Sequence, residues 1–315
     1  MDKLKICFVG IGSIAKRHIC NIRQVCHNRD IMVIVDAFRR CFSSSLPDGV
    51  DYEYSSLEDM PNDYDVIFIT NPTEYHLETL EKFHHKGHHF FIEKPLVSIH
   101  QLERAKRFKR RNKSIYYVAC PLRYNAVIQY IKSNIDPSDV ISVRSISSSY
   151  LPDWRPGQDY RKTYSAHKAF GGGVSIDLIH EWDYLTYLFG MPVNILCSIG
   201  KKSDLEIDSD DYAVYIGEMR DKIVELHLDY FGRSTIREIQ LITKEDTIIG
   251  DIVGSNIRWL KTGRFIEFHE ERDDYQRREL EYFLDLISGT EKTTDDYNNA
   301  IRVLNMTQGI VQIIH

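Results

Sequence analysis

Long hydrophobic runs are missing from this sequence of 315 residues. No stretch approaches the roughly 18 uncharged apolar residues that a membrane-spanning helix needs, so we expect no membrane partner. The sequence also has no excess of positive charge, because its 46 acidic residues outnumber its 40 lysines and arginines and the net charge is −6. Such a chain is a poor candidate for a nucleic acid partner, which requires basic surface to neutralise phosphates.

Cysteine is scarce as well and follows no motif. The six cysteines are scattered, and none belongs to a CxxC pair. This pattern fits reduced thiols in a cytoplasmic protein better than a disulfide framework or a zinc site. The N-terminus shows no signal-peptide pattern, which agrees with that location. The histidine-rich run at 84–89 defines no ligand geometry and is predicted to be a solvated turn, so no metal is expected.

Short apolar runs alternate with helical patterns over the first 120 residues. The apolar runs are rich in Val, Ile and Phe and lie at 4–9, 31–35, 66–69, 90–92 and 115–119. Runs this short are typical of parallel strands buried on both faces. Because helical patterns lie between them, we predict βαβ units and an α/β domain with a doubly wound parallel sheet over residues 1–120.

The pattern changes after residue 120. A long helix is predicted over 171–189, and five strand-like segments follow between residues 193 and 252. One of them alternates apolar and polar residues as a half-exposed antiparallel strand does. Two charged helices are predicted at about 274–286 and 295–314. Residues 121–315 are therefore expected to form an α+β domain with an open, mostly antiparallel sheet.

A glycine-rich turn, GIGSIA, follows the first predicted strand. Gly10 permits a tight turn, and Gly12 lets a pyrophosphate approach the backbone. The helix that begins with Ser13 and Ile14 would direct its N–H groups and its dipole at the phosphates. The turn is therefore predicted to bind a dinucleotide, as in the Rossmann fold.

The end of the second strand bears on the choice of cofactor. Asp36 follows the turn by about 20 residues, where a carboxylate accepts the adenosine ribose hydroxyls of NAD. A carboxylate also repels a 2′-phosphate, although Arg39 or Arg40 could receive one. We therefore predict NAD, with NADP less favoured.

Polar residues follow the third and fourth strands, at the sheet edge where open α/β sheets bind ligands. Lys94 could hold a substrate hydroxyl and favour its alkoxide by charge. In isolation, a surface pair of Glu93 and Lys94 would be the simpler interpretation. The residues expected to contact the cofactor here are Thr70, Asn71, Pro72, His76, Glu93 and Lys94.

These motifs together resemble the glucose-fructose oxidoreductase / inositol dehydrogenase / MocA (Gfo/Idh/MocA) family. The resemblance rests on GIGSIA, TNPTEYH and IEKPL in the first half, and on PLRYN and GGGVSIDLIHEWD in the second. It implies an NAD(P)-dependent oxidoreductase that acts on a sugar, sugar nucleotide or cyclic polyol. By resemblance, the catalytic residues are Lys94, Asp177 and His180. It also implies a homodimer or homotetramer formed through the C-terminal sheet.

One departure concerns the predicted catalytic helix. Many family members place the aspartate and histidine four positions apart, whereas His180 follows Asp177 by three. Positions three apart still share a helix face, so both side chains can face one pocket. An unperturbed histidine pKa of about 6.5 suits proton transfer near neutral pH. Whether Asp177 or Asp183 supports His180 stays open.

The stretch 150–165 is predicted to be a loop. Its mixture of aromatic and charged side chains suits a sugar, phosphorylated sugar or sugar nucleotide, and a packed surface loop is the alternative. The residues expected to bind substrate are Arg123, Tyr124, Trp154, Arg155, Tyr160, Tyr164, Asp177 and His180.

Two further functions remain open from the sequence. One is a glycosidase that uses tightly bound NAD for transient oxidation, which would release free sugar without net NADH. The other is a non-catalytic regulator that keeps the cofactor fold as a sensor and turns over no sugar.

Overall fold

The computed structural model describes residues 2–39, 45–292 and 295–311, and it forms two compact units. Unit 1 comprises the described residues of 1–121 and 272–301, and unit 2 those of 122–271 and 302–315. The chain passes from unit 1 to unit 2 after residue 121 and returns to unit 1 over residues 272–301. The domain ranges 1–120 and 121–315 stay predictions.

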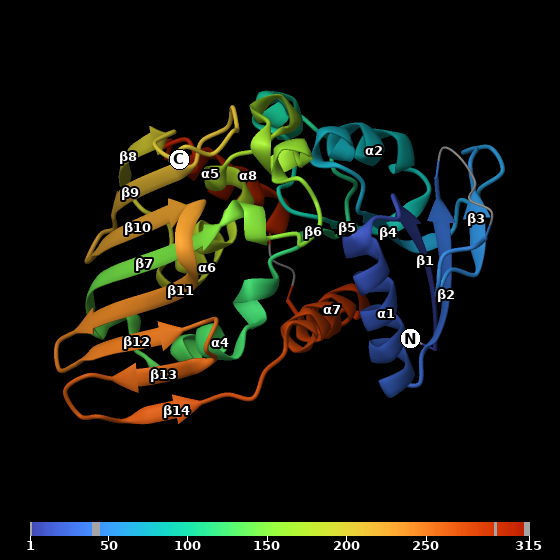
Figure 1. The fold of residues 1–315 in the computed structure, drawn as a ribbon. Coiled ribbons are helices and arrows are strands. Elements are labelled where there is room, and N and C mark those ends of the chain that lie inside the picture. Colours follow the sequence, from blue (N-terminus) through green and yellow to red (C-terminus); the bar gives the residue numbers. More distant parts are fainter. Residues whose placement is uncertain (1, 40–44, 293–294, 312–315) are drawn as a thin grey trace. The chain divides into compact units, whose positions relative to one another are not determined.

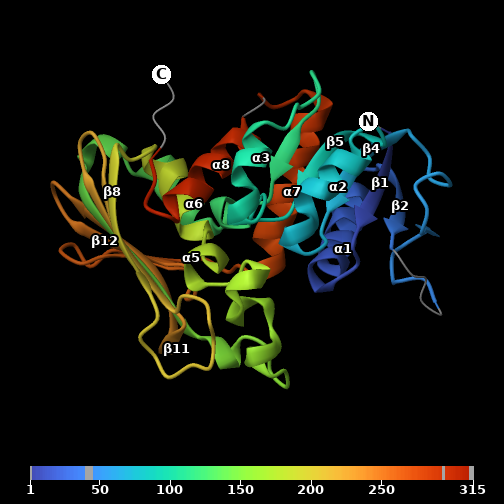
Figure 2. The ribbon, with the colours of Figure 1, turned by 90° about the horizontal axis from the view of Figure 1, so that it is seen from above.

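Unit 1 contains a six-stranded parallel sheet in the order β3-β2-β1-β4-β5-β6. The connecting helices are α1 (Ser13–Asn28) and α2 (His76–Phe83), labelled in Figure 1, and α3 (Leu102–Lys106), labelled in Figure 2. This confirms the doubly wound α/β sheet and adds the short β3, which the sequence did not predict. The strands are β1 (Lys3–Val9), β2 (Met32–Phe38), β3 (Tyr52–Tyr54), β4 (Tyr64–Ile69), β5 (Gly87–Ile92) and β6 (Tyr116–Val118).

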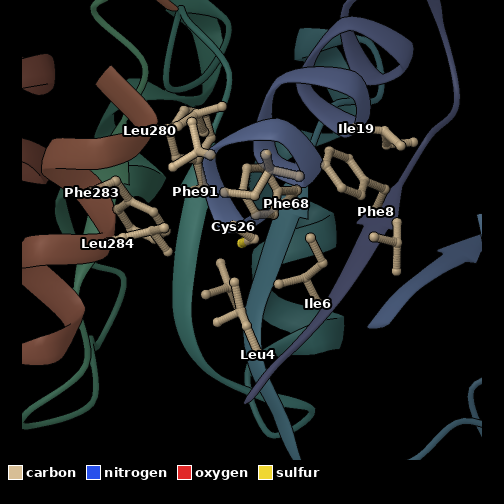
Figure 3. Packing of buried hydrophobic residues seen from close by; sticks show 14 of the residues in the cluster. Leu4, Ile6, Phe8, Ile19, Cys26, Phe68, Phe91, Leu280, Phe283 and Leu284 are labelled. Atoms are coloured by element: carbon tan, nitrogen blue, oxygen red, sulfur yellow. The ribbon is translucent and has the colours of Figure 1, made fainter. Parts of the chain in front are cut away.

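The hydrophobic core of unit 1 explains why the chain returns to it. Helix α7 (Arg272–Ser288) contributes Leu280, Phe283 and Leu284 to the core beside α1 and the sheet (Figure 3). The ring of Phe283 lies 5.2 Å from that of Phe91 on β5. Complete burial of each such side chain contributes about 1.5–3 kcal/mol. The apolar face of α7 therefore ties this late segment to the first sheet.

Unit 2 contains an eight-stranded sheet in the order β14-β13-β12-β11-β7-β10-β9-β8. Only β7 and β10 pair in parallel, so the predicted open and mostly antiparallel sheet is confirmed. Strands β7, β13 and β14 were not predicted. The strands are β7 (Val140–Tyr150), β8 (Asn194–Gly200), β9 (Tyr212–Glu218), β10 (Ile223–Asp229), β11 (Phe231–Thr243), β12 (Thr247–Asp251), β13 (Asn256–Trp259) and β14 (Phe265–Glu267).

The two faces of this second sheet differ. Helices α4 (Ala126–Asn134), α5 (Val174–Asp177) and α6 (His180–Phe189) lie on one face, as Figure 2 shows for α5 and α6. On that face Val224 and Leu228 are buried, whereas Ile216 and Ile223 on the other are each 43% exposed. The last helix, α8 (Asp296–Met306), spans the boundary between the two units. Among the described residues, no helix is long and apolar enough to cross a membrane.

Candidate functional site

The glycine-rich turn of unit 1 is shaped by close backbone packing. Gly10 has a φ of +93°, and a Cβ atom there would lie 2.7 Å from the Cα of Asn71. Gly12 precedes α1, and a Cβ atom there would meet nothing within 4 Å. Ser13 and Ile14 form the first turn of the helix, whose N–H groups face outward from this end. The open space beside Gly12 and the helix end fit a diphosphate.

A cavity of about 330 Å³ lies beside this turn. It opens where the strand order reverses between β1 and β4, the usual ligand site of such sheets. Three residues that were predicted to contact the cofactor, Gly10, Asn71 and Pro72, line this cavity. The buried Oδ1 of Asn71 has no hydrogen-bond partner among the described residues, which suits a donor on a bound cofactor. Thr70 does not line the cavity, because its hydroxyl donates to the carbonyl of Gly10 at 2.7 Å.

Asp36 lies elsewhere than the sequence predicted. Strand β2 continues to Phe38, so Asp36 lies within the strand and is 1% exposed. Its carboxylate accepts a hydrogen bond from the hydroxyl of Tyr64 at 2.6 Å, and burial raises its pKa despite that bond. Arg39, rather than Asp36, lines the cavity. Arg40 lies outside the described residues, and the contact of Asp36 with a ribose stays a prediction.

His76 holds two loops together at this edge of the sheet. It is 1% exposed, its Nε2 lies 2.8 Å from the carbonyl of Asn71, and its Nδ1 lies 3.0 Å from that of Pro95. Burial lowers its pKa. Both ring nitrogens therefore face backbone oxygens, and the predicted contact of His76 with a cofactor stays a prediction.

The end of β5 is fixed by a residue that the sequence analysis missed. His18 of α1 is buried, and its Nε2 lies 2.5 Å from Oε1 of Glu93. Burial raises the pKa of Glu93, but hydrogen bonding to His18 and the charges of His18 and Lys94 outweigh it and hold that pKa below its usual range. Glu93 thus braces the turn that carries Lys94, where the Lys94–Pro95 peptide bond is cis. The sequence could have indicated His18, because it lies one helical turn after Ile14 of the glycine-rich turn.

In unit 2, tyrosine hydroxyls surround Asp177. The hydroxyl of the fully buried Tyr230 donates to Oδ2 of Asp177 at 2.5 Å. The charge of Asp177 and burial raise the pKa of Tyr164, and hydrogen bonding to the same carboxylate adds to the shift. Tyr164 itself is 44% exposed. The predicted substrate residues Asp177 and Tyr164 are therefore brought together, and Tyr230 joins them unpredicted.

The predicted helix over 171–189 is two helices. Helix α5 ends at Asp177, Leu178 and Ile179 form a turn, and α6 begins at His180. The expectation that Asp177 and His180 share one helix face is therefore wrong. The turn before α5 requires glycine, because Gly173 has a φ of +129°. A Cβ atom there would lie 2.2 Å from Oδ1 of Asp210.

Arg123 pairs with Asp183 in unit 2. The guanidinium of Arg123 forms a bidentate ion pair with Asp183, with distances of 2.6 and 2.8 Å, and both side chains are largely buried. Such a pair holds α6 against the short helix η3 (Pro121–Tyr124), which also carries Tyr124. The predicted contact of Arg123 with a substrate stays a prediction, as does the choice between Asp177 and Asp183 as the partner of His180.

The loop at 150–165 packs toward the Asp177 group. The ring of Trp154 meets that of Tyr230 edge to face at 5.2 Å, and its Nε1 donates to Ser149. The guanidinium of Arg155 lies 5.4 Å from the ring centre of Tyr164. Trp154 and Arg155 therefore contact the two tyrosines that interact with the buried Asp177. Tyr160 is different, because it also lines a separate cavity.

The sequence comparisons identify relatives of the chain. Residues 4–120 match the sequence model of the oxidoreductase family GFO_IDH_MocA, described as an NAD-binding Rossmann fold. An inositol 2-dehydrogenase of Rhizobium meliloti (strain 1021) is 24% identical over 212 residues. The match covers 65% of this chain and 61% of that relative, less than two thirds of its length.

Solved structures share the fold over nearly the whole chain. An apo levoglucosan dehydrogenase has a TM-score of 0.81 at 15% identity, covering 98% of this chain and 96% of that one. A myo-inositol 2-dehydrogenase from Lactobacillus plantarum has a TM-score of 0.75 at 19% identity, covering 97% and 95%. A UDP-N-acetylglucosamine 3-dehydrogenase from Acidithiobacillus ferrooxidans has a TM-score of 0.72 at 16% identity, covering 98% and 96%. At these identities the likeness establishes the common fold.

Proposed function

Because residues 4–120 belong to the NAD-binding oxidoreductase family Gfo/Idh/MocA, we propose that the protein oxidises or reduces a carbon of a sugar, sugar nucleotide or cyclic polyol. The observation that carries this proposal is the group of Asp177, Tyr164 and Tyr230 beside the start of α6, where His180 lies. Named dehydrogenases of inositol, levoglucosan and UDP-N-acetylglucosamine with the same fold support the substrate class.

NAD would be held by the backbone of the glycine-rich turn. Gly10 and Gly12 shape the approach, the first turn of α1 offers N–H groups to the diphosphate, and Asn71 and Pro72 line the adjoining cavity. The nicotinamide supplies a hydride acceptor when bound. Arg39 and the buried Asp36 lie on the side of β2, where the ribose of the adenosine is expected.

The protein's own residues would move the proton. In the oxidative direction, His180 takes the proton of the substrate hydroxyl as its carbon loses a hydride and the C–O bond becomes C=O. The ammonium of Lys94 stabilises the negative charge that develops on the oxygen. Asp177 accepts hydrogen bonds from tyrosine hydroxyls, so it acts as a fixed negative charge that supports the imidazolium form of His180.

Substrate contacts are proposed on the 150–165 loop, next to the tyrosines that interact with Asp177. The exposed ring of Tyr164 and the side chains of Trp154 and Arg155 offer apolar faces and hydrogen-bond donors, the mixture that sugars require. Tyr124 of η3 and Tyr160 of the 150–165 loop are also proposed to contact the substrate.

The uncovered face of the second sheet is proposed to join copies of the chain into a homodimer or homotetramer in the cytoplasm. Leu196, Ile216 and Ile223 are 64%, 43% and 43% exposed on β8, β9 and β10. Contiguous exposed apolar side chains mark interaction surfaces. Light scattering of the protein and of Ile216→Asp tests this, and a monomer in both samples would contradict it.

The enzymatic proposal is tested by incubation with NAD and a panel of inositols, anhydro sugars and sugar nucleotides. We expect NADH to accumulate with at least one member of the panel. Release of free sugar without net NADH would instead identify the glycosidase, and NAD binding without turnover of any sugar would identify the regulator.

A further inference from the structure

Unit 2 contains a second cavity, of about 350 Å³, that the catalytic proposal does not use. It lies where β7 ends and β11 begins, next to the loop at 202–205. Tyr230 contacts Asp177, whereas the next residue, Phe231, lines this cavity, as expected where successive side chains of extended chain face opposite sides. The cavity is therefore distinct from the Asp177 group. Its volume is at the lower end of the roughly 300–1,000 Å³ typical of small-molecule sites.

The walls of this cavity combine aromatic rings with positive charge. Tyr150, Tyr160 and Phe231 contribute three rings, and Lys202 and Arg233 contribute two cations. Asp204 is the one acidic residue among the described lining residues, so the lining keeps a net positive charge. Stacking on aromatic rings selects flat ring systems, and free cations select anions.

Arg233 is already placed for an anion. Its guanidinium lies 3.9 Å from the ring centre of Tyr150, so its face is covered and its N–H edge is left for a ligand. Among the described residues, neither Arg233 nor Lys202 has a carboxylate partner. Both cations are therefore available to an anionic ligand beside the three rings.

The cavity is also rigidly built. The buried carboxylate of Asp211 accepts the N–H groups of Lys202 and Ser203, each at 2.8 Å. The hydroxyl of Tyr160 accepts the N–H of Glu206 at 3.1 Å, which ties the 150–165 loop to this wall. The opposite wall is the cross-strand pair of Tyr150 and Phe231. These contacts hold the backbone of both walls in place.

From these features we propose that the cavity binds a nucleotide, with the base between the aromatic rings and the phosphate on Arg233 and Lys202. The nucleotide is either part of a sugar-nucleotide substrate or a free effector. Tyr160 in the wall and Tyr164 on Asp177 belong to the same loop, so either source can influence the proposed catalytic group.

Calorimetric titration with UMP, UDP and AMP, at saturating NAD to fill the Rossmann unit, tests the proposal without any need for turnover. We expect at least one nucleotide to bind, and we expect Arg233→Gln and Lys202→Ala each to weaken it by about tenfold or more, as loss of one charge-assisted contact does. Arg144→Gln is the matched control, because Arg144 is an exposed arginine of β7 that does not line the cavity. It should leave the affinity unchanged.

The source of the nucleotide is distinguished by kinetics. If UDP competes with a sugar-nucleotide substrate, the cavity binds the nucleotide part of that substrate. If UDP changes kcat without competing, the cavity binds a free effector. No binding at millimolar nucleotide, or equal losses in Arg233→Gln and Arg144→Gln, overturns the proposal. The titration does not depend on turnover, so its result can be interpreted even if the enzymatic proposal fails. The two proposals are therefore tested separately.

Discussion

The two units build their candidate sites from different parts of the polypeptide. In unit 1 the backbone dominates: a glycine turn, a helix end, and the carbonyls of Asn71 and Pro95 that His76 holds together. In unit 2 the side chains dominate, with Asp177 held by tyrosine and Asp183 held by Arg123. Backbone sites tolerate few changes in glycine but many in side chains, whereas side-chain sites fail when one partner is lost.

The largest effect on activity is expected from a substitution in unit 2. His180→Ala should lower kcat by about 10²–10⁴, the usual contribution of a general acid–base, because the proton then has no acceptor. The dissociation constant of NAD should stay the same, because His180 belongs to the other unit. Steady-state kinetics and NAD titration check both. An undiminished kcat would contradict this role and indicate that Lys94 or Tyr164 accepts the proton instead.

The backbone character of unit 1 is tested by two glycines. Gly10→Ala should lower the free energy of unfolding by about 1–3 kcal/mol, since it forces a positive φ on alanine, and should weaken NAD binding. Gly12→Ala should change that free energy by less than about 0.5 kcal/mol, because its Cβ atom meets nothing within 4 Å. It should still weaken NAD binding by crowding the diphosphate. Denaturant unfolding and NAD titration separate the two, and full NAD affinity in Gly12→Ala would contradict the phosphate site.

Loss of a single supporting hydroxyl in unit 2 should lower stability but leave NAD binding unchanged. Tyr230→Phe removes the hydrogen bond to the buried Asp177 and should lower the free energy of unfolding by about 1–3 kcal/mol. The pH profile of kcat should shift as well, because the carboxylate proposed to support His180 is then less well held. Ser198→Ala is a matched control, because it also removes a hydroxyl bonded to a tyrosine, Tyr212, but at an exposed position. An unchanged profile with reduced stability would make Tyr230 purely structural.

The smallest effect concerns pH and Glu93. Its pKa is lowered in the folded state from 4.5, so its contribution to stability is present above about pH 4.5 and is lost as the pH falls through the folded value. Unfolding by urea between neutral and acidic pH should therefore show a smaller loss of stability in Glu93→Gln than in the parent protein. Equal pH dependence in the two would contradict the pairing with His18.

The same difference between the units explains what the sequence could predict. Five of the six strands of unit 1 and the turn at Gly10–Ala15 follow from local patterns, and the structure confirms them. Strand β7 was missed because its serines blur the alternation of apolar and polar residues. Which core α7 would join was not predictable either, since an amphipathic helix does not specify its partner in sequence. The pairs Asp177–Tyr230 and Arg123–Asp183 join residues more than fifty positions apart, so no local motif reveals them.

The central claim is that the protein transfers hydride from a sugar carbon to NAD. It is tested most directly with a sugar that carries deuterium on the carbon to be oxidised. The account predicts that deuterium appears in the NADH formed and that His180→Ala slows its appearance. Turnover of that sugar with no deuterium in NADH would contradict the account.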